Sequence, residues 1–491
     1  MLFNSYEFIF AFLPISFFVY FYLNRKRLTT ASKFWLVFTS LFFYSWWNVI
    51  YLPLILISII FNYTTTSMMI KYDESKKNYI SKKSLLQVGL FFNIGLLVYF
   101  KYMDFFISNS NTFFGSDIGS LGLALPLAIS FFTLQQIAFL VDSYEGLVKE
   151  KNFLDYSIFV TFFPQLIAGP IVHHKDMIPQ FSRVKNKIKN YKNIGLGLFI
   201  FSIGLFKKVV IADTFAVWVG AGFDTASTLN LYEAWATSLS YTFQLYFDFS
   251  GYTDMAIGAA LLFNIKLPIN FNSPYKATGM IDFWKRWHIT LTNFITTYIY
   301  TPIIRSFNKL DLHKAMFATV ITFLIAGLWH GASWMFVMFG GLHGLGIAVN
   351  HYWQKKAKIK MNKFLAWFIT FNFVNITFIF FRAKEWDDAL KVIGSMFSSD
   401  NIVLPGILES RLSFLSELGV TFGSFTANIQ GGYFNPVMLI AGFFFILLFK
   451  NSTQNLDSFK MGYKSILLSV FAFFCSLTLL SKPSEFLYFN F

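Results

Sequence analysis

The chain has 491 residues, of which 55% are hydrophobic, 21% are aromatic and only 13% are charged, and its mean hydropathy is +0.53. Apolar runs of about 20 residues can cross a bilayer, and such runs recur along the whole length, so the composition excludes a soluble globular protein and predicts a polytopic membrane protein. The net charge of +15 comes from lysines and arginines clustered between apolar runs, which favours cytoplasmic loops over a nucleic-acid-binding surface.

Basic stretches set the predicted topology. Residues 25–27 (RKR) follow the first apolar run, which predicts an uncleaved helix whose N-terminus lies outside. The basic stretches predicted to face the cytoplasm are 71–83, 175–192 and 355–363. The stretches predicted on the outer face, which contain almost no Lys or Arg, are 108–120 and 401–431. Counting apolar runs between them predicts about ten to twelve membrane crossings, with both termini outside, in a single membrane domain, residues 1–491.

Prolines interrupt several apolar runs in the middle of the chain, at Pro126, Pro164, Pro170, Pro268 and Pro302. Non-helical backbone at membrane depth survives only where it is buried in protein or lines a cavity. Residues 120–350 are therefore expected to form a core of interrupted helices that surrounds a cavity.

Adjacent histidines occur at His173 and His174. Adjacent residues do not share a helical face, so the sequence does not predict a metal site there. Motifs typical of zinc proteases, P-loop ATPases and serine hydrolases do not occur in a suitable context, so neither triad hydrolysis nor ATP-driven transport is supported.

Polar side chains interrupt the apolar run 244–263, at Asp248, Ser250, Tyr252 and Asp254. Carboxylates within a membrane span need partners, and proton relays or ion pathways are common reasons for them. A polar clamp between neighbouring helices explains them equally well, so both interpretations stay open.

The next segment, residues 268–291, combines basic and aromatic side chains. It contains Asn272, Asp282, Trp284, Lys285, Arg286, Trp287 and His288. The basic pair indicates the cytoplasmic boundary, and the tryptophans suit the headgroup level, so an interfacial belt is one explanation. A basic mouth lined by aromatic rings would also suit an anionic, nucleotide-bearing donor.

The apolar stretch LIAGLWHGASWMF, residues 324–336, holds His330 between Trp329 and Gly331. An ionisable side chain inside a span is costly and marks a functional site that faces a cavity, and imidazole is suited to proton transfer near pH 7. Gly331 would let a substrate approach the backbone closely. The alternative is a histidine hydrogen-bonded between helices. The later His343 has small neighbours, which favours a packing role.

The chain resembles the membrane-bound O-acyltransferase (MBOAT) family, in its bacterial branch that transfers acyl groups to cell-envelope polymers. The resemblance covers nearly the whole chain and rests on six blocks in order: FFPQLIAGPIV (162–172), YFDFSGYTDMAIGAALLF (246–263), LPINFNSPYKA (267–277), DFWKRWHITL (282–291), GLWHGASWMFVMFGGLHG (327–344) and FFRAKEWDDAL (380–390). The chain departs from the family at HHKD, residues 173–176, where relatives often carry an arginine near position 173.

The resemblance implies an all-α polytopic fold in the bacterial inner membrane, with a ring of transmembrane helices around a central tunnel. The outer side of that membrane, where both termini are predicted, is the periplasm. It implies that His330 is the essential catalytic histidine and that His288 is the second histidine near the tunnel. The donor would be acetyl-CoA or an acyl carrier protein, with no bound cofactor. The implied partner is a periplasmic SGNH-type O-acetyltransferase, because the chain itself contains no such domain.

The chain ends in F-x-Y-x-x-F, formed by Phe486, Tyr488 and Phe491. This ending is similar to the C-terminal motif of the short partner peptide in teichoic-acid D-alanylation, and the likeness implies that Tyr488 relays the acyl group. A tyrosine hydroxyl is a sensible nucleophile when a base removes its proton. The alternative is an aromatic tail that anchors the last helix at the interface.

The expected function is O-acetylation of a cell-envelope polysaccharide, with peptidoglycan ahead of alginate or another exopolysaccharide. A lipid acceptor is a further possibility, which the bacterial-branch blocks and the terminal motif argue against. A transporter or flippase without chemistry is the alternative from another class, with Asp248 and Asp254 as its coupling carboxylates.

Overall fold

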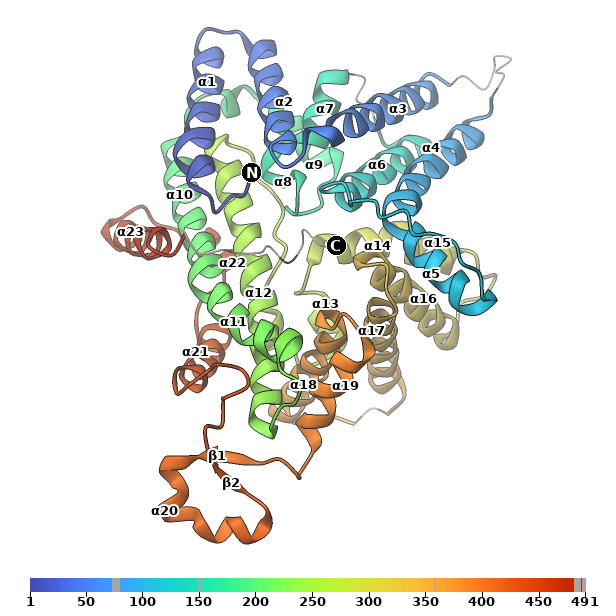
Figure 1. Ribbon diagram of the computed structural model, residues 1–491. Coiled ribbons are helices and arrows are strands. Elements are labelled where there is room, and N and C mark those ends of the chain that lie inside the picture. Colours follow the sequence, from blue (N-terminus) through green and yellow to red (C-terminus); the bar gives the residue numbers. More distant parts are fainter. Residues whose placement is uncertain (73–79, 149–151, 358, 481–486, 488–491) are drawn as a thin grey trace. The chain divides into compact units, whose positions relative to one another are not determined.

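The computed structural model describes residues 1–72, 80–148, 152–357, 359–480 and 487 (Figure 1). Nearly all regular structure in these residues is helical, which confirms the all-α prediction. The exception is a two-stranded parallel sheet of β1 (Val403–Pro405) and β2 (Thr421–Gly423), in which Val403 pairs with Thr421. The terminal motif of Phe486, Tyr488 and Phe491 lies outside the described residues.

The chain divides into two compact units, and each combines segments that are far apart in the sequence. The first comprises Met1–Phe206, Gly251–Asn270 and Asn455–Phe491, and the second comprises Lys207–Ser250 and Phe271–Gln454. The helix α12 (Leu231–Leu262) contributes its first part to the second unit and its last part to the first. The prediction of a single membrane domain stays a prediction.

The first unit contains the N-terminal helices and the last helices of the chain. Its further α-helices are α1 (Leu13–Arg25), α2 (Thr29–Ser45), α3 (Leu52–Ile70), α4 (Lys82–Leu97), α5 (Met103–Phe114), α6 (Ile129–Tyr144), α7 (Phe153–Thr161), α8 (Phe163–Leu166), α9 (His174–Ser182), α10 (Tyr191–Phe206), most of α22 (Ser452–Ser458) and α23 (Tyr463–Leu477). Short π-helical or 3-10 segments extend or join them: η1 (Glu7–Phe12), η2 (Val49–Tyr51), η3 (Val98–Tyr102) and η4 (Val184–Lys187).

The second unit holds the helices of the predicted site. Its further α-helices are α11 (Asp213–Gly220), α13 (Met280–Trp284), α14 (Ile289–Ile295), α15 (Thr301–Arg305), α16 (Leu312–His330), α17 (Trp334–Tyr352), α18 (Lys363–Arg382), α19 (Trp386–Phe397), α20 (Glu409–Leu412) and α21 (Phe434–Leu448). Its π-helical and 3-10 segments are η5 (Lys207–Ala212), η6 (Ala221–Thr225), η7 (Pro274–Lys276), η8 (Thr296–Tyr300), η9 (Trp353–Ala357), η10 (Gly406–Leu408) and η11 (Ser413–Leu418).

Six helical stretches in the described residues are long and apolar enough to cross a membrane, and a pair bent by 46° makes up to seven. They are Glu7–Arg25, Val49–Ile70, Lys82–Phe114, Tyr191–Thr225, Leu312–His330 and Lys363–Arg382, with the bent pair Phe434–Leu448 and Ser452–Ser458. The polytopic membrane architecture is therefore confirmed. The count of ten to twelve also included interrupted or polar stretches, such as the one around Asp248 in α12, and that count stays a prediction, as does the side of each terminus.

Local sequence signals begin several of these helices. Asp311 accepts a hydrogen bond from the backbone N–H of Lys314 at 2.9 Å and so starts α16, the helix that ends at His330. Asn362 accepts one from Phe364 at 2.8 Å at the start of α18. Such caps satisfy backbone donors that a helix end leaves unpaired, so they fix where each helix begins.

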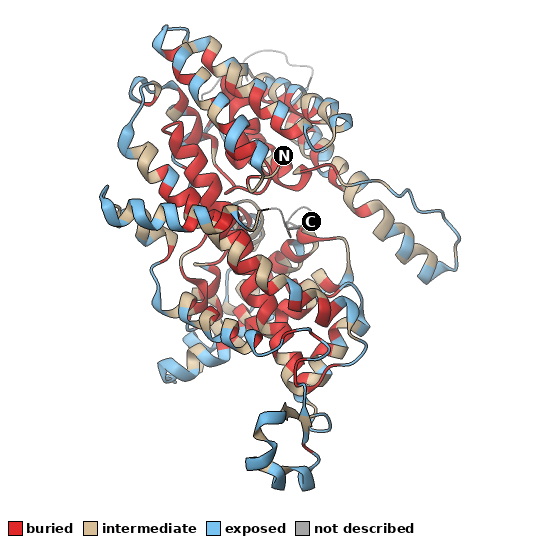
Figure 2. Cartoon of the chain, turned by 60° about the vertical axis from the view of Figure 1, so that its left-hand side comes forward, coloured by how far each residue is buried: buried red, intermediate tan, exposed pale blue. Residues whose placement is uncertain are grey.

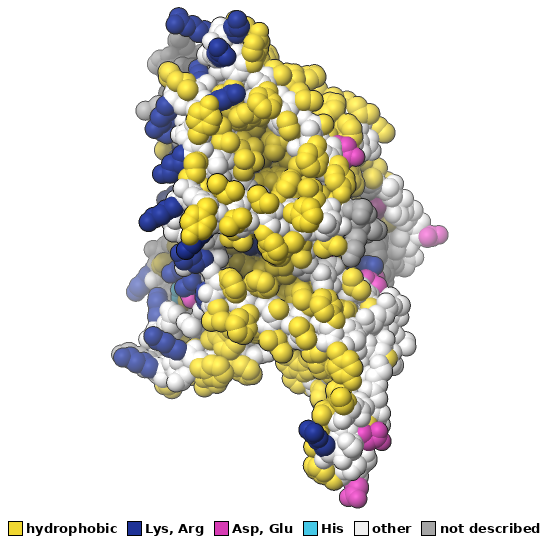
Figure 3. All heavy atoms as spheres, turned by 90° about the vertical axis from the view of Figure 1, so that its left-hand side faces the viewer, with side chains coloured by type: hydrophobic (Ala, Val, Ile, Leu, Met, Phe, Trp, Pro, Cys, Tyr) yellow, Lys and Arg dark blue, Asp and Glu magenta, His cyan; other side chains and the backbone are white. Residues whose placement is uncertain are grey.

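Hydrophobic side chains cover much of the face shown in Figure 3, with lysine and arginine side chains at the border of that surface. Exposed apolar side chains also occur elsewhere in the described residues, such as Phe91 on α4 and Phe474 on α23. Many helices have buried residues along one side and exposed residues along another (Figure 2). Buried polar side chains form hydrogen bonds with one another: Asn93 of α4 donates to Asn62 of α3 at 2.6 Å, and Asn62 donates back at 3.2 Å. This distribution suits a lipid environment, because lipid accepts exposed apolar side chains and supplies no hydrogen bonds.

Candidate active site

The second unit builds its site on a hairpin of two closely packed helices, α16 and α17. A Cβ atom added to Gly327 would lie 2.3 Å from the backbone oxygen of Phe336 and 2.9 Å from Cα of Gly340. The same test at Gly340 gives 2.3 Å to the backbone oxygen of Phe323. Only glycine fits at both positions, so the backbones of the two helices are in direct contact three residues before His330.

His330 is the last residue of α16 and is buried. Three aromatic rings surround its imidazole, with centroid distances of 4.9 Å to Trp329, 5.1 Å to Phe381 and 6.0 Å to Phe339. A site this apolar has a low effective dielectric, which strengthens the interactions of any charge that develops on the ring. The predicted catalytic histidine is therefore enclosed by aromatic side chains, and its catalytic role stays a prediction.

Gly331 ends α16 and has a different role from the one expected. A Cβ atom there would lie 2.1 Å from the ring of Phe336, so this ring occupies the space that the sequence argument assigned to a substrate. Phe336 in turn packs edge-on against Phe381 at 5.1 Å, and Phe381 contacts His330. The glycine thus allows the aromatic packing that holds His330.

His288 lies in the same unit and is fully buried. Its backbone is left-handed, with φ +44° and ψ +52°, directly before α14 begins. Its ring centroid is 4.8 Å from that of Phe249 and 6.4 Å from that of Trp329. Both predicted histidines are therefore neighbours of one indole. Burial lowers the pKa of His288 to about 3, so its ring is neutral at physiological pH.

His343 of α17 is held by hydrogen bonds that fix its proton. Trp284 Nε1 donates to His343 Nδ1 at 3.1 Å, so this nitrogen carries no hydrogen. The proton of the neutral ring is then on Nε2, which lies 2.8 Å from Thr377 Oγ1. A ring locked between two buried partners suits the packing role that its small neighbours indicated.

The tryptophans of the basic, aromatic segment are buried rather than exposed at an interface. Trp287 packs against Phe283, Phe271 and Phe378 with centroid distances of 5.7, 5.1 and 5.3 Å. Trp284 contacts Phe323 of α16 at 4.7 Å and thereby joins α13 to the helix that carries His330. These rings belong to the core of the site unit, where they support the hairpin.

The charged residues of the same segment lie at its surface. Arg286 Nε donates to Asp282 Oδ1 at 2.7 Å, and both side chains are about one-third exposed. Lys285 is exposed. Asn272 joins this group through its backbone N–H, which donates to the carbonyl oxygen of Arg286 at 2.9 Å, while its side chain accepts from Asn451 at 2.8 Å. The predicted donor-binding charges are therefore held together and accessible.

Asp248 finds its partner in Lys208 of η5, at 2.7 Å. The same ammonium group lies 2.7 Å from Asp213 Oδ1, so one buried lysine serves two carboxylates. This arrangement favours the clamp interpretation of Asp248. Lys208 was not among the predicted residues, although two lysines inside the apolar run SIGLFKKVVIADTF indicate buried charges that need partners. Nearby, the buried hydroxyl of Ser250 has no hydrogen-bond partner among the described residues.

The remaining predicted residues lie outside the described part of the second unit. Tyr252 and Asp254 fall in the first unit, where Tyr252 stacks on Phe3 at 4.7 Å and Asp254 packs against Gly204 of α10. Tyr488 lies outside the described residues. The site that the structure assembles thus consists of two histidines beside Trp329, a supporting aromatic core, and an accessible group of charges in the same unit.

Comparisons with known proteins identify the family to which the chain is similar. A family model described as MBOAT, membrane-bound O-acyltransferase family, matches residues 29–384. The chain is 46% identical to a peptidoglycan O-acetyltransferase of Helicobacter pylori, over 100% of this chain and 98% of the relative. It is 33% identical to a probable alginate O-acetylase of Azotobacter vinelandii, over 84% and 82% of the two chains. A teichoic acid D-alanyltransferase of Streptococcus thermophilus is 26% identical over 54% of this chain and 69% of the relative.

Proposed function

Because the chain belongs to the membrane-bound O-acyltransferase family, we propose that it transfers an acetyl group from a cytoplasmic thioester across the inner membrane for the O-acetylation of peptidoglycan. Peptidoglycan is chosen as the acceptor because the chain is 46% identical to a peptidoglycan O-acetyltransferase along essentially the full length of both chains. The relation to the alginate enzyme is weaker, at 33% over 84% of the chain, which makes alginate or another exopolysaccharide the second candidate.

In this proposal His330 is the general base. Its imidazole takes the proton of the attacking hydroxyl as that oxygen bonds to the thioester carbonyl carbon. The carbon–sulfur bond then breaks, and the proton passes to the leaving sulfur as a free thiol. A positioned base contributes roughly 10²–10⁴-fold to such a step. The neutral ring of His288 orients or polarises the thioester, since a neutral imidazole can donate a hydrogen bond to a carbonyl oxygen.

The donor is acetyl-CoA or an acetylated carrier protein, and it docks at the exposed charges of Lys285 and Arg286. Both donors carry phosphate groups, which a guanidinium–ammonium pair attracts. The first acceptor is the hydroxyl of Tyr488, and a periplasmic SGNH-type transferase moves the acetyl group from there to the polysaccharide. The docking of the donor rests on the accessible charges, and the relay rests on the terminal motif. The partner transferase rests on the resemblance to the bacterial branch of the family.

The acceptor is tested in the native host. The gene is deleted and replaced with wild type, His330→Gln or His313→Gln, and muramidase fragments are analysed by mass spectrometry for base-labile acetyl groups. His313 is the matched control, because it lies on α16 as well but is exposed. Wild type and His313→Gln should restore acetylated fragments, and His330→Gln should not. If the deletion strain keeps its peptidoglycan acetylation but loses acetyl groups from an exopolysaccharide, then that exopolysaccharide is the acceptor.

The relay is tested with purified protein and radiolabelled acetyl-CoA. Label on the C-terminal peptide of wild type that is absent from His330→Ala and Tyr488→Phe supports the relay. Label that needs His330 but survives Tyr488→Phe removes the relay and keeps the enzyme. A chain that is never labelled by acetyl-CoA or an acetylated carrier protein, and that transfers no acetyl group with its partner present, contradicts the proposed reaction and favours a transporter.

A further inference from the structure

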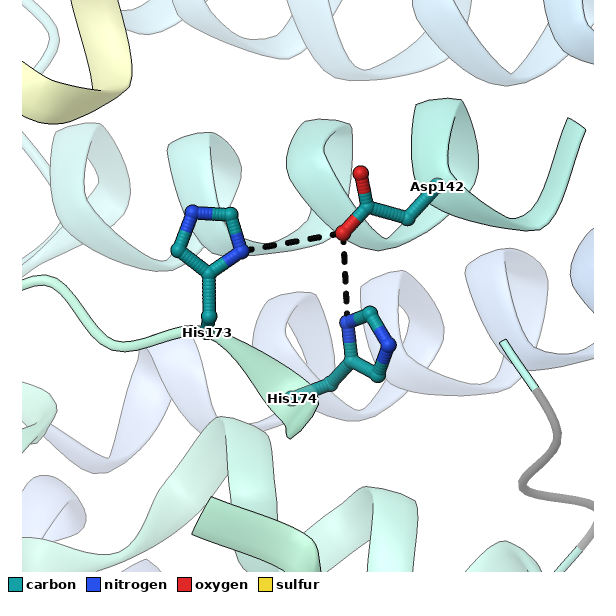
Figure 4. A group of neighbouring side chains, drawn as sticks. All are labelled: Asp142, His173 and His174. Carbon is teal, nitrogen blue, oxygen red and sulfur yellow. Dashed lines mark ion pairs between the residues drawn. The ribbon is translucent and has the colours of Figure 1, made fainter. Parts of the chain in front are cut away.

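A second group of ionisable side chains lies in the first unit, at the end of α6 and the start of α9. Asp142 is in the last turn of α6, and His174 is the first residue of α9. His173 precedes that helix in extended conformation, with φ −92° and ψ +143°. The helix therefore starts between the two histidines, and the argument that adjacent residues do not share a helical face does not apply. Figure 4 shows both rings turned toward one oxygen of Asp142.

The two distances from the histidine nitrogens to the carboxylate oxygen are close to those in a zinc site. Nδ1 of His173 lies 3.6 Å from Oδ2 of Asp142, and Nδ1 of His174 lies 3.3 Å from the same oxygen. An N–H···O hydrogen bond is normally 2.7–3.2 Å long, so both separations exceed that range. Two ligands bound tetrahedrally at 2.0–2.1 Å from zinc lie about 3.3–3.4 Å apart, which is close to the observed spacing. One ligand atom from each of the three residues lies within 4.8 Å of the others.

Burial and packing restrict the positions of these three side chains. The side chains of Asp142 and His174 are each 8% exposed, and that of His173 is 26% exposed. The ring of Phe139, one turn before Asp142 on α6, packs edge-on against His174 with centroids 5.3 Å apart and so holds the imidazole in place. The group is thus buried at His174 and more accessible at His173.

We propose that Asp142, His173 and His174 bind one Zn²⁺ ion through one carboxylate oxygen and two imidazole nitrogens, with water in the fourth position. Two nitrogens and one oxygen are a common zinc ligand set, and three protein ligands with an open position are typical of accessible zinc sites. The bound ion would join the end of α6 to the start of α9. This site does not depend on the acetyl-transfer proposal, because none of its residues takes part in that chemistry.

The test measures metal content in the full-length protein, purified in detergent with an affinity tag that contains no histidine. The protein is stripped with EDTA, equilibrated with Zn²⁺ and passed over a desalting column, and bound zinc is measured by mass spectrometry. Wild type should retain one zinc per chain, and His173→Ala or His174→Ala should bind at least about tenfold more weakly. His313→Ala is the matched control, since that exposed histidine lies in the other unit and should leave binding unchanged.

Cobalt substitution supplies an independent readout. Co²⁺ in the stripped wild-type protein should give the visible absorption of a four-coordinate ion, and His173→Ala should lose it. Zinc retained equally by wild type and His173→Ala would mean an adventitious ion only and would overturn the proposal, as would a wild-type protein that retains none. If His174→Ala fails to fold, the comparison uses His173→Ala alone. His173 is the most exposed of the three ligands, so its substitution should disturb folding least.

Discussion

The indole ring of Trp329 packs against the imidazole ring of His330, its neighbour in the chain, with centroids 4.9 Å apart and planes inclined by 68°. The same indole lies 6.4 Å from the ring of His288. Two residues at the end of one helix therefore supply both the proposed base and an indole ring that neighbours both histidines. Small shifts at the end of α16 should consequently affect both histidines.

The Gly331→Ala substitution should lower acetyl transfer by about 10²-fold, because a misplacement of about 1 Å at a catalytic group can cost that much. The added Cβ would lie 2.1 Å from the ring of Phe336, which supports Phe381 and thereby His330. The measurement is transfer from labelled acetyl-CoA by detergent-purified protein.

Gly341→Ala is the control for that substitution, because a Cβ atom there meets only Leu324, at an ordinary 3.4 Å. Gly331→Ala combined with Phe336→Leu should recover part of the activity. Equal activities of the Gly331→Ala and Gly341→Ala proteins would show that the Phe336 ring does not position His330.

The Thr377→Val substitution should lower stability by about 1–3 kcal/mol and leave activity near normal, because it removes the partner of His343 Nε2 and leaves a buried donor unsatisfied. Thr370→Val is the matched control on α18, since Thr370 bonds only the Ala366 carbonyl of its own helix among the described contacts. Thermal unfolding in detergent compares the two. Equal unfolding temperatures, or loss of activity in folded Thr377→Val protein, would contradict a purely structural His343.

The Lys208→Met substitution should destabilise the protein by about 3–5 kcal/mol, because it leaves Asp248 and Asp213 without their shared buried cation. Adding Asp248→Leu should restore part of the loss. Lys207→Met tests the neighbouring lysine, which donates to Ser452 at 2.7 Å and is only half-buried, and should cost much less. Denaturant titration in detergent measures all three. A double variant less stable than Lys208→Met alone would show that the pair is not the source of the loss.

Acid should destabilise the folded protein through His288. Burial lowers the pKa of this ring to about 3 in the folded state, against about 6.5 for an unfolded histidine, so the folded state binds fewer protons between these values. The stability contribution is complete above about pH 6.5 and decreases as pH falls toward 3, by up to about 2 kcal/mol at pH 5.

The check is the difference in unfolding temperature between pH 7 and pH 5 for wild type and His288→Asn. Asparagine tolerates the left-handed backbone at this position, so the variant changes the titrating group with little backbone strain. Its temperature difference should be smaller than that of wild type. Identical differences would mean that the pKa of His288 is the same in the folded and unfolded states.

Much of the helical architecture follows from apolar runs and caps that are local in sequence, such as Asp311 before α16. His330 could be singled out because an imidazole in an apolar helix is costly whatever its neighbours are. Lys208 was missed because its value as a partner of Asp248 depends on a contact between distant segments. The role of Gly331 was misjudged for a different reason: the ring of Phe336, only five residues later, packs onto it because the chain reverses between α16 and α17.

The contact between Gly327 and Gly340 has a consequence for how this protein can change over evolutionary time. The two helices of the hairpin contact each other at this point through main-chain atoms. The position of His330 therefore does not depend on the side chains on the outer surface of the hairpin. Exposed residues such as Phe317 on α16 and Leu345 on α17 can be exchanged for other apolar residues as the lipid environment changes. Neither glycine can be replaced alone, so inherited variation in this hairpin should accumulate on its outward face.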